Sequence, residues 1–250
     1  MQIKDKVAII TGASGGIGRE VSLKLAAQGA RVALVARNLD KLNALKAEIE
    51  AGSGQAFIFS ADIVDGKAVE GMAAAVVKQL GGIDILVNCA FWGPPGSLAE
   101  TDETFWDKTI DTTLKAPFLC IRAVVPTMRR AGAGRIVNIG SRAGKVGEDN
   151  RTAYCAAKWG LEGLNAALQE ELARDNIHVH MITPAATNTS WWPGVGAKLT
   201  PEVLARFVPP ETIADAVVFA ISAPDQVIIP DIPVYNFRNP FEGKGSPFAE

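Results

Sequence analysis

Three side chains in the second half of the chain, Ser141, Tyr154 and Lys158, could together move a proton. Tyr154 and Lys158 are four residues apart, which places them on one face if this segment is helical. Phenols ordinarily have a pKa of about 10 and are poor acid–base catalysts at neutral pH, but a neighbouring ammonium group favours the phenolate. The spacing therefore indicates a tyrosine that serves as general acid and base. A tyrosine packed on a surface helix is the alternative interpretation.

A glycine-rich turn near the N-terminus could bind a phosphate. Val7–Thr11 is apolar and predicts a buried strand, and four of the seven residues from Gly12 to Gly18 are glycine, ahead of a helical pattern. Such a turn lets the backbone approach a phosphate, and the helix N-terminus directs free N–H groups at it. A nucleoside-triphosphatase loop would need Lys and then Ser or Thr next, where Arg19 and Glu20 stand. A tight turn without a ligand is the remaining alternative.

Apolar segments alternate with helical patterns along the chain, and these elements must position the candidate residues. After the first strand, the expected strands are 31–36, 56–60, 83–87, 135–139, 177–182 and 227–229. The expected helices after the glycine turn are 39–49, 68–80, 102–130, 153–174 and 210–221. This alternation predicts an α/β fold: a Rossmann-like, doubly wound, seven-stranded parallel sheet with helices on both faces, in a single domain over 1–250. Ligands of such sheets bind at the carboxyl ends of the strands, where Ser141 follows the strand 135–139.

Composition narrows the class of protein. The chain has 250 residues, 48% hydrophobic and 21% charged, with a net charge of −2, which suits one globular domain and gives no indication of nucleic acid or membrane as partner. The three cysteines, Cys89, Cys120 and Cys155, show no paired spacing and fit a reducing compartment. His178 and His180 have no ligand cluster around them, so no metal site is predicted. Without a signal peptide or an apolar run of 18 residues, we expect a cytoplasmic protein.

The end of the second expected strand indicates which dinucleotide the turn would bind. A dinucleotide-binding fold normally has an acidic side chain there, which binds the ribose 2′-hydroxyl. Here the strand ends in Ala36 and Arg37, without a carboxylate. The guanidinium of Arg37 suits a phosphate on that ribose, which favours NADP(H) over NAD(H). A solvated surface arginine is the alternative.

Two segments interrupt the alternation. The connection 185–210 is long for a compact domain and predicts a substrate lid. The C-terminal tail, 236–250, is rich in Pro, Gly and Phe. Because ligand pockets are mostly apolar, Trp92, Trp191 and Trp192 either line a pocket for a substrate of apolar or ring character or anchor the lid.

In order and spacing, these motifs resemble the short-chain dehydrogenase/reductase family over nearly the whole chain. The residues that carry the resemblance are Thr11-Gly12-x-x-x-Gly16-x-Gly18, Asp62, Asn88, Ser141, Tyr154, Lys158, Pro184 and Thr189. The resemblance implies that Tyr154 protonates the carbonyl oxygen and that Ser141 hydrogen-bonds to it. It also implies that Lys158 binds the nicotinamide ribose and lowers the pKa of the tyrosine.

The resemblance further implies a cofactor site along the strand ends. The residues implied are Gly12, Ser14, Gly16, Ile17, Gly18, Arg37, Asp62, Ile63, Asn88, Tyr154, Lys158, Pro184, Thr187 and Thr189. By the family pattern, Asp62 and the backbone of Ile63 hold adenine, and Thr189 meets the carboxamide or a phosphate. Arg37 matches the subgroup that prefers NADP(H).

The chain departs from the family pattern at several positions. Phe91 stands where a glycine is usual and places bulk beside Trp92 near the substrate. The family's fourth catalytic residue is an asparagine that maintains a helix distortion and a proton relay, and Thr113 takes its position. We expect the Thr113 hydroxyl to bond a preceding carbonyl of its own helix. The Val-Asp-Gly-Gly ending associated with the family's commonest tetramer is absent.

The sequence thus predicts an NADP(H)-dependent oxidoreductase that transfers a hydride between nicotinamide and a carbonyl or secondary alcohol, in a homodimer or homotetramer. The alternative is a cofactor-binding sensor or structural protein of the same fold with weak catalysis, motivated by Phe91 and Thr113. A serine hydrolase acting through Ser141 is disfavoured because no Gly-x-Ser-x-Gly setting surrounds it.

Overall fold

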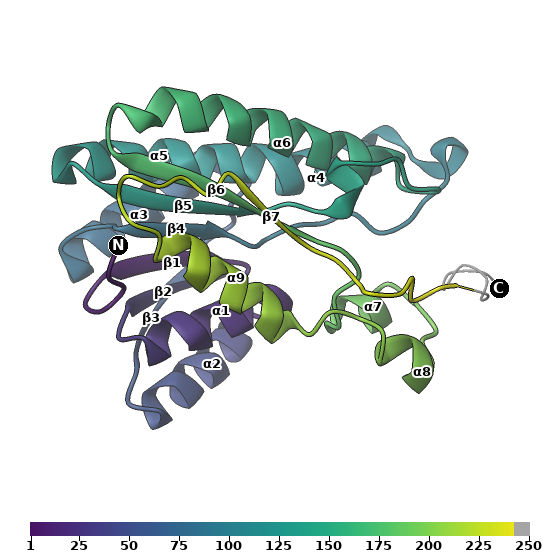
Figure 1. Cartoon of the computed structure of the whole chain (residues 1–250), viewed down its shortest axis with the longest axis horizontal. Coiled ribbons are helices and arrows are strands. Elements are labelled where there is room, and N and C mark those ends of the chain that lie inside the picture. The colour runs from purple at the N-terminus through teal and green to yellow at the C-terminus, as the bar shows by residue number, and fades with distance from the viewer. Residues whose placement is uncertain (243–250) are drawn as a thin grey trace.

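The computed structural model describes residues 1–242, so the part of the predicted tail beyond residue 242 lies outside the described residues. Seven parallel strands form one sheet in the order β3-β2-β1-β4-β5-β6-β7 (Figure 1). The strands are β1 (Val7–Thr11), β2 (Arg31–Ala36), β3 (Gln55–Ser60), β4 (Ile85–Asn88), β5 (Gly134–Ile139), β6 (Ile177–Pro184) and β7 (Asp231–Val234). The strand order reverses between β1 and β4, which creates a switch point at their carboxyl ends. The predicted doubly wound, seven-stranded parallel sheet is confirmed.

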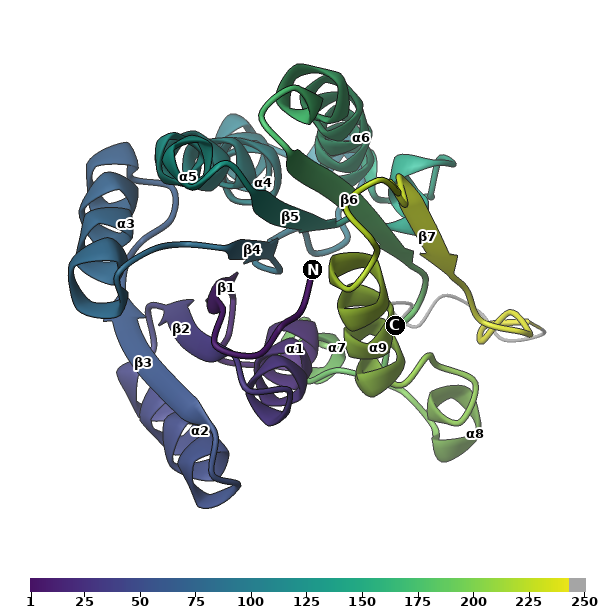
Figure 2. The same ribbon diagram turned by 60° about the vertical axis from the view of Figure 1, so that its left-hand side comes forward.

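Helices cover both faces of the sheet (Figure 2). One face carries α1 (Gly16–Ala27), α2 (Leu39–Ala51) and α9 (Pro210–Ile221). The other carries α3 (Gly66–Leu80), α4 (Glu103–Ile110), α5 (Ala116–Ala131) and α6 (Thr152–Ala173). Two short helices, α7 (Trp191–Gly194) and α8 (Pro201–Leu204), lie in the connection between β6 and α9. None of the helices within residues 1–242 has the length and apolar character needed to cross a membrane.

The sheet divides the core in two because side chains alternate along each strand. Ala8 and Ile10 of β1 pack in the cluster under α1 and α9, whereas Val7 and Ile9 pack in the cluster under α3 and α5. All four are at most 1% exposed. Burial on both sides explains why these strands are continuous apolar runs, and it fixes the register that brings the strand ends to one edge.

The predicted last strand, 227–229, is wrong, because β7 begins at Asp231, two residues after the end of the predicted strand. The ladder with β6 decides its position: the N–H of Met181 donates to the Pro230 carbonyl at 3.0 Å, and Ile182 pairs with Ile232. Apolar character alone favoured Val227 and Ile228, yet these side chains are 39% and 49% exposed. Pro233 is tolerated in β7 because this is an edge strand, where one missing N–H breaks no ladder.

His180 on β6 links folding to pH. Its side chain is fully buried, and its Nδ1 lies 2.8 Å from the Ile229 carbonyl and donates to it, which leaves Nε2 unprotonated and without a partner among the described residues. Burial lowers the pKa of His180 from 6.5 to about 4. Between pH 6.5 and pH 4, His180 is therefore protonated in the unfolded chain and neutral in the folded chain.

We expect the free energy of unfolding to have its full value, as far as His180 determines it, above pH 6.5. It should decrease as the pH falls from 6.5 toward 4. The loss is about 3 kcal/mol, because each unit of difference in pKa contributes about 1.4 kcal/mol. Urea unfolding between pH 7 and pH 4 should show a shallower decline for His180→Gln than for the parent chain. Equal slopes would assign the acid sensitivity to other groups.

Candidate active site

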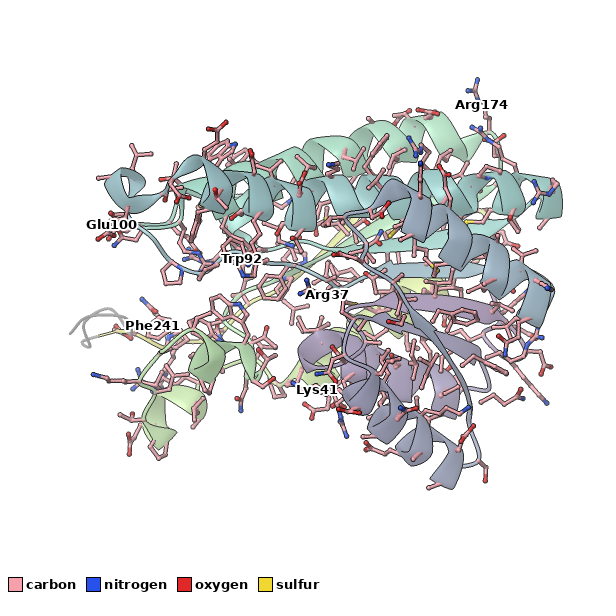
Figure 3. The ribbon with its side chains drawn as sticks, turned by 180° about the vertical axis from the view of Figure 1, so that it is seen from behind. Arg37, Lys41, Trp92, Glu100, Arg174 and Phe241 are labelled. Atoms are coloured by element: carbon pink, nitrogen blue, oxygen red, sulfur yellow. The ribbon has the colours of Figure 1, made fainter. Side chains whose placement is uncertain are left out.

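A cleft of about 1940 Å³ runs across the carboxyl ends of the strands. Arg37, Lys41, Trp92 and Phe241 lie along it and are labelled in Figure 3. The predicted site residues that line it are Gly12, Ser14, Gly16, Ile17, Gly18, Arg37, Asp62, Ile63, Phe91, Trp92, Ser141, Tyr154, Lys158, Pro184, Thr187, Thr189, Trp191 and Trp192. Asn88 and Thr113 are buried behind its wall. The topology therefore gathers residues from the whole length of the chain into one site.

The glycine turn between β1 and α1 forms one wall of this cleft. Gly12 has a φ of +66°, and a Cβ there would lie 2.9 Å from the backbone of Ala90. A Cβ on Gly18 would lie 2.4 Å from the Gly12 carbonyl oxygen. Only glycine permits these approaches, so the turn closes tightly and leaves the start of α1 open to the cleft.

Arg37 and Lys41 form a positive group at the start of α2. The Asn38 side chain caps the helix by accepting from the N–H of Lys41 at 2.9 Å. This cap fixes the helix start, so Arg37 precedes it and Lys41 follows one turn later, both exposed and both lining the cleft. Sequence analysis missed Lys41, although its i+4 spacing from Arg37 was a usable signal.

Ser141, Tyr154 and Lys158 meet on the opposite side of the switch point. Ser141 follows β5, and a hydrogen bond between its hydroxyl and the Tyr154 phenol lowers the pKa of the phenol. Lys158, one turn after Tyr154 in α6, donates from Nζ to the Ile139 carbonyl at 2.7 Å, and this Nζ lies 5.7 Å from the centre of the Tyr154 ring. The predicted proton-transfer group is thus assembled by the end of one strand and one helix face.

Burial controls the charges of this group. It raises the pKa of the Tyr154 phenol, which is 7% exposed, against the opposing effects of Arg151 and of the Ser141 hydrogen bond. Burial also lowers the pKa of Lys158 to about 7, so its charge is incomplete near neutral pH. Ionisation of the tyrosine in this cleft therefore depends on every positive charge close to it.

Thr113 lies in a π-helical turn, Asp111–Lys115, between α4 and α5. The expected bond to its own helix is wrong. The Thr113 hydroxyl instead donates to the Trp92 carbonyl at 2.7 Å and accepts from the Trp92 N–H at 3.1 Å. The extra residue of a π turn presents the hydroxyl to this loop, so a threonine fastens the helix distortion to the segment beside the cleft.

We expect Thr113→Val to lower the free energy of unfolding by about 1–3 kcal/mol, because both backbone groups of Trp92 would lose a partner in a half-buried place. Thr113→Ser keeps the hydroxyl and should retain most of the stability. Denaturant unfolding of both variants measures the difference. Equal stability of the two variants would mean that the hydroxyl contributes nothing.

Aromatic side chains surround Tyr154 in the cleft. Phe91 lies between Tyr154 and Trp191, with ring centres 6.1 and 5.8 Å away. Trp192 turns toward the lid: its Nε1 donates to the Thr187 carbonyl at 2.8 Å, and its ring packs on Phe207 at 5.0 Å. Of the two interpretations of the tryptophans, Trp191 thus has the position expected of a pocket residue and Trp192 that of an anchor.

Trp92 is the third tryptophan that lines the cleft. Trp92 packs against Phe105 at 4.9 Å, and the ammonium of Lys108 lies 4.3 Å above its ring. Next to it, Gly93 lies against Tyr154: a Cβ there would come within 2.4 Å of the Tyr154 ring. Gly93 and Arg151 are site residues that sequence analysis missed.

Comparison with known proteins supports a relationship to the dehydrogenases whose motifs line this cleft. The family model for short chain dehydrogenases matches residues 6–199. The (2S)-[(R)-hydroxy(phenyl)methyl]succinyl-CoA dehydrogenase subunit BbsD of Thauera aromatica is 36% identical over 88% of this chain and 90% of its own length. Glycine betaine reductase ATRR of Emericella nidulans is 33% identical over 92% of this chain, but the match spans 18% of that protein.

Solved structures with a similar fold point to the same family. A metagenomic short-chain oxidoreductase in complex with NADP has a TM-score of 0.83 and 36% identity, covering 95% of this chain and 100% of that one. A 7α-hydroxysteroid dehydrogenase complexed with NADH and 7-oxo glycochenodeoxycholic acid has a TM-score of 0.87 and 30% identity, covering 93% and 94%. Sequence, fold and family model together show that this chain belongs to the short-chain dehydrogenase/reductase family of oxidoreductases.

Proposed function

We propose that this chain is an NADP(H)-dependent oxidoreductase that interconverts a carbonyl and a secondary alcohol on a substrate of apolar or ring character. The observation that carries the proposal is the single cleft that joins two chemically different ends. Arg37 and Lys41 lie at one end, and Ser141, Tyr154 and Lys158 lie at the other. A dinucleotide with an extra ribose phosphate matches the first end, and a proton transfer matches the second.

The residues present fit such a cofactor. Gly12 and Gly18 have no room for a Cβ, and the α1 N-terminus that they expose suits a pyrophosphate. Arg37 can donate two parallel hydrogen bonds to a 2′-phosphate, and Lys41 adds a second positive charge. The related metagenomic oxidoreductase in complex with NADP supports this choice, while the related steroid dehydrogenase, in complex with NADH, shows that the fold accepts either dinucleotide.

When bound, the nicotinamide ring supplies or accepts the hydride. Tyr154 would give its phenolic proton to the carbonyl oxygen during reduction and take it back during oxidation. Ser141 would donate a second hydrogen bond to the same oxygen, which fixes its position and favours the charge that develops there. Lys158 would hold the nicotinamide ribose and add positive charge beside the tyrosine.

We infer that the substrate occupies the space between Phe91, Tyr154 and Trp191. The Phe91 ring lies about 6 Å from each of the other two rings, and together they form an apolar wall that can contact a ring or alkyl group. The connection 185–210, which carries α7 and α8, would serve as the lid, with Trp192 packed on Phe207 at its base. This arrangement places an apolar wall beside the polar groups of Ser141 and Tyr154 in the same cleft.

The decisive experiment follows NADPH and NADH oxidation with a panel of ketones, quinones and aldehydes, and NADP⁺ reduction with secondary alcohols. We expect turnover with at least one ring-bearing substrate and a higher kcat/KM with NADPH than with NADH. Tight NADPH binding without turnover on any member would favour the sensor or structural alternative. Equal kcat/KM values for both dinucleotides would contradict the proposed preference.

A further inference from the structure

Arg151, the residue before α6, contacts the reactive tyrosine directly. Its guanidinium carbon lies 4.2 Å from the centre of the Tyr154 ring and 5.5 Å from the centre of the Trp191 ring. All three side chains line the cleft. The guanidinium of Arg151 therefore lies over one face of the Tyr154 ring. The Trp191 ring, from the lid segment, lies on the guanidinium as well.

Arg151 makes these contacts without a carboxylate partner among the described residues. Its Nε is buried and has no hydrogen-bond partner there. Of the carboxylates that line the cleft near it, Glu148 accepts instead from Arg142 at 2.8 Å, and Asp149 accepts from the Asn150 amide at 3.1 Å. Arg151 is half-buried, and withdrawing part of a guanidinium from water without a carboxylate partner is costly, so the electron-rich faces of Tyr154 and Trp191 offset part of this cost.

The charge of Arg151 acts on Tyr154 in one direction. A phenolate spreads its negative charge into the ring, so a cation on the ring face stabilises the phenolate more than the neutral phenol. Burial lowers the pKa of Lys158 to about 7 in this cleft, so the charge of this lysine varies near neutral pH. The guanidinium of Arg151 lies closer to the Tyr154 ring centre, at 4.2 Å, than the ammonium of Lys158, at 5.7 Å.

The geometry points to Arg151 as a second cation for the proton-transfer step, which stacks on Tyr154 to favour its phenolate and is kept in place by Trp191 of the lid. This inference rests on the proposed function, in which Tyr154 moves the proton. It assigns Arg151 to the group that already holds Ser141 and Lys158. It also couples that group to the lid, because Trp191 belongs to α7.

Other groups around Tyr154 also change the pKa of its phenol. The hydrogen bond with Ser141 lowers the pKa of the Tyr154 phenol, whereas Glu148 and Cys155 raise it. Lys158 lies 5.7 Å from the ring centre, farther than Arg151. Removing Arg151 leaves all of these groups in place, so its own contribution can be measured.

The test is a spectroscopic pH titration that needs no substrate. The chain has two tyrosines, so in a Tyr235→Phe background the ultraviolet absorbance of tyrosinate reports Tyr154 alone. We expect Arg151→Gln to raise the midpoint by about one pH unit and Arg151→Lys to raise it less. The matched control is Arg122→Gln, which removes a guanidinium lying 5.7 Å above Phe118 on α5. It should leave the midpoint unchanged.

Two results of the titration would overturn the inference: an unchanged midpoint in Arg151→Gln, or no ionisation of the parent Tyr154 before the chain unfolds, as followed by circular dichroism. Neither depends on turnover, so they are separate from a failure of the proposed function. Trp191→Ala should shift the midpoint in the same direction by a smaller amount. An unchanged midpoint in Arg151→Gln, together with a KM raised only for anionic substrates, would instead make Arg151 a substrate anchor.

Discussion

Replacing Tyr154 by phenylalanine should reduce kcat by about a thousandfold while NADPH binding stays within about threefold of the parent. Positioned acid–base groups contribute roughly 10²–10⁴ to the rate, and phenylalanine cannot carry the proton. The substitution keeps the ring that packs near Phe91 and under Arg151, so the shape of the cleft is retained. Stopped-flow or steady-state NADPH oxidation with the best substrate of the panel measures the loss.

The matched control for this variant is Tyr235→Phe, which removes the only other phenol of the chain. Tyr235 is 47% exposed and takes no part in the cluster around Ser141, so its replacement should leave kcat within about twofold to threefold. Near-parental turnover by Tyr154→Phe would refute Tyr154 as the proton donor. It would direct attention to Lys158, the next group able to move a proton in the cleft.

Arg37→Glu should weaken NADPH binding by about a hundredfold and NADH binding by less than about threefold. A charge-assisted hydrogen bond contributes about 1.5–3 kcal/mol, and the new carboxylate also repels a 2′-phosphate. NADH has no phosphate there, and a carboxylate at the end of β2 can accept from its ribose hydroxyl. Titration of the cofactor's fluorescence gives both dissociation constants.

Lys41→Gln serves as the graded comparison, because it removes one positive charge from the same end of the cleft without adding a negative one. Its effect on NADPH should be smaller than that of Arg37→Glu, at about tenfold or less. If Arg37→Glu weakened the binding of NADPH and NADH equally, the 2′-phosphate would not be the group that Arg37 binds. The proposed preference for NADP(H) would then be refuted.

Periodicity was sufficient for the architecture. Buried strands such as Val7–Thr11 are apolar on both faces, and the helices between them repeat their apolar residues every three or four positions, so the order of elements could be predicted. The last strand could not, because Asp231–Val234 is defined by its ladder with β6 and not by its own composition. The break near Thr113 was not visible in the periodicity, since a π turn has no sequence period of its own, and only the family pattern indicated a helix distortion there.

The position of the candidate site was predictable where residues follow the ends of parallel strands, and the roles of these residues stay predictions. Ser141, Tyr154 and Lys158 come from consecutive elements, and parallel strands bring those elements to one edge. Arg151 and Gly93 could not be found in this way. Arg151 acts through the direction that its side chain takes at the helix start, and Gly93 through a Cβ that would meet the Tyr154 ring. Such roles depend on contacts that only the folded chain defines.

Some predictions remain open. The roles of the cofactor-binding residues, the preference for NADP(H), association into a homodimer or homotetramer and a cytoplasmic location stay predictions. The substrate pocket around Phe91 and Trp191 stays a proposal. Each concerns a molecule or a compartment outside the chain itself, so neither periodicity nor packing within residues 1–242 decides it.

The proline in β7 has a consequence for how molecules of this protein can meet. Met181 and Ala185 donate to the carbonyls of Pro230 and Val234, so alternate residues of β7 face β6 and Pro233 directs its nitrogen outward. That nitrogen carries no hydrogen, so a strand from another molecule would find a gap in the middle of this edge. The proline thus protects the edge against lateral growth into an intermolecular sheet, the first step of strand-driven aggregation.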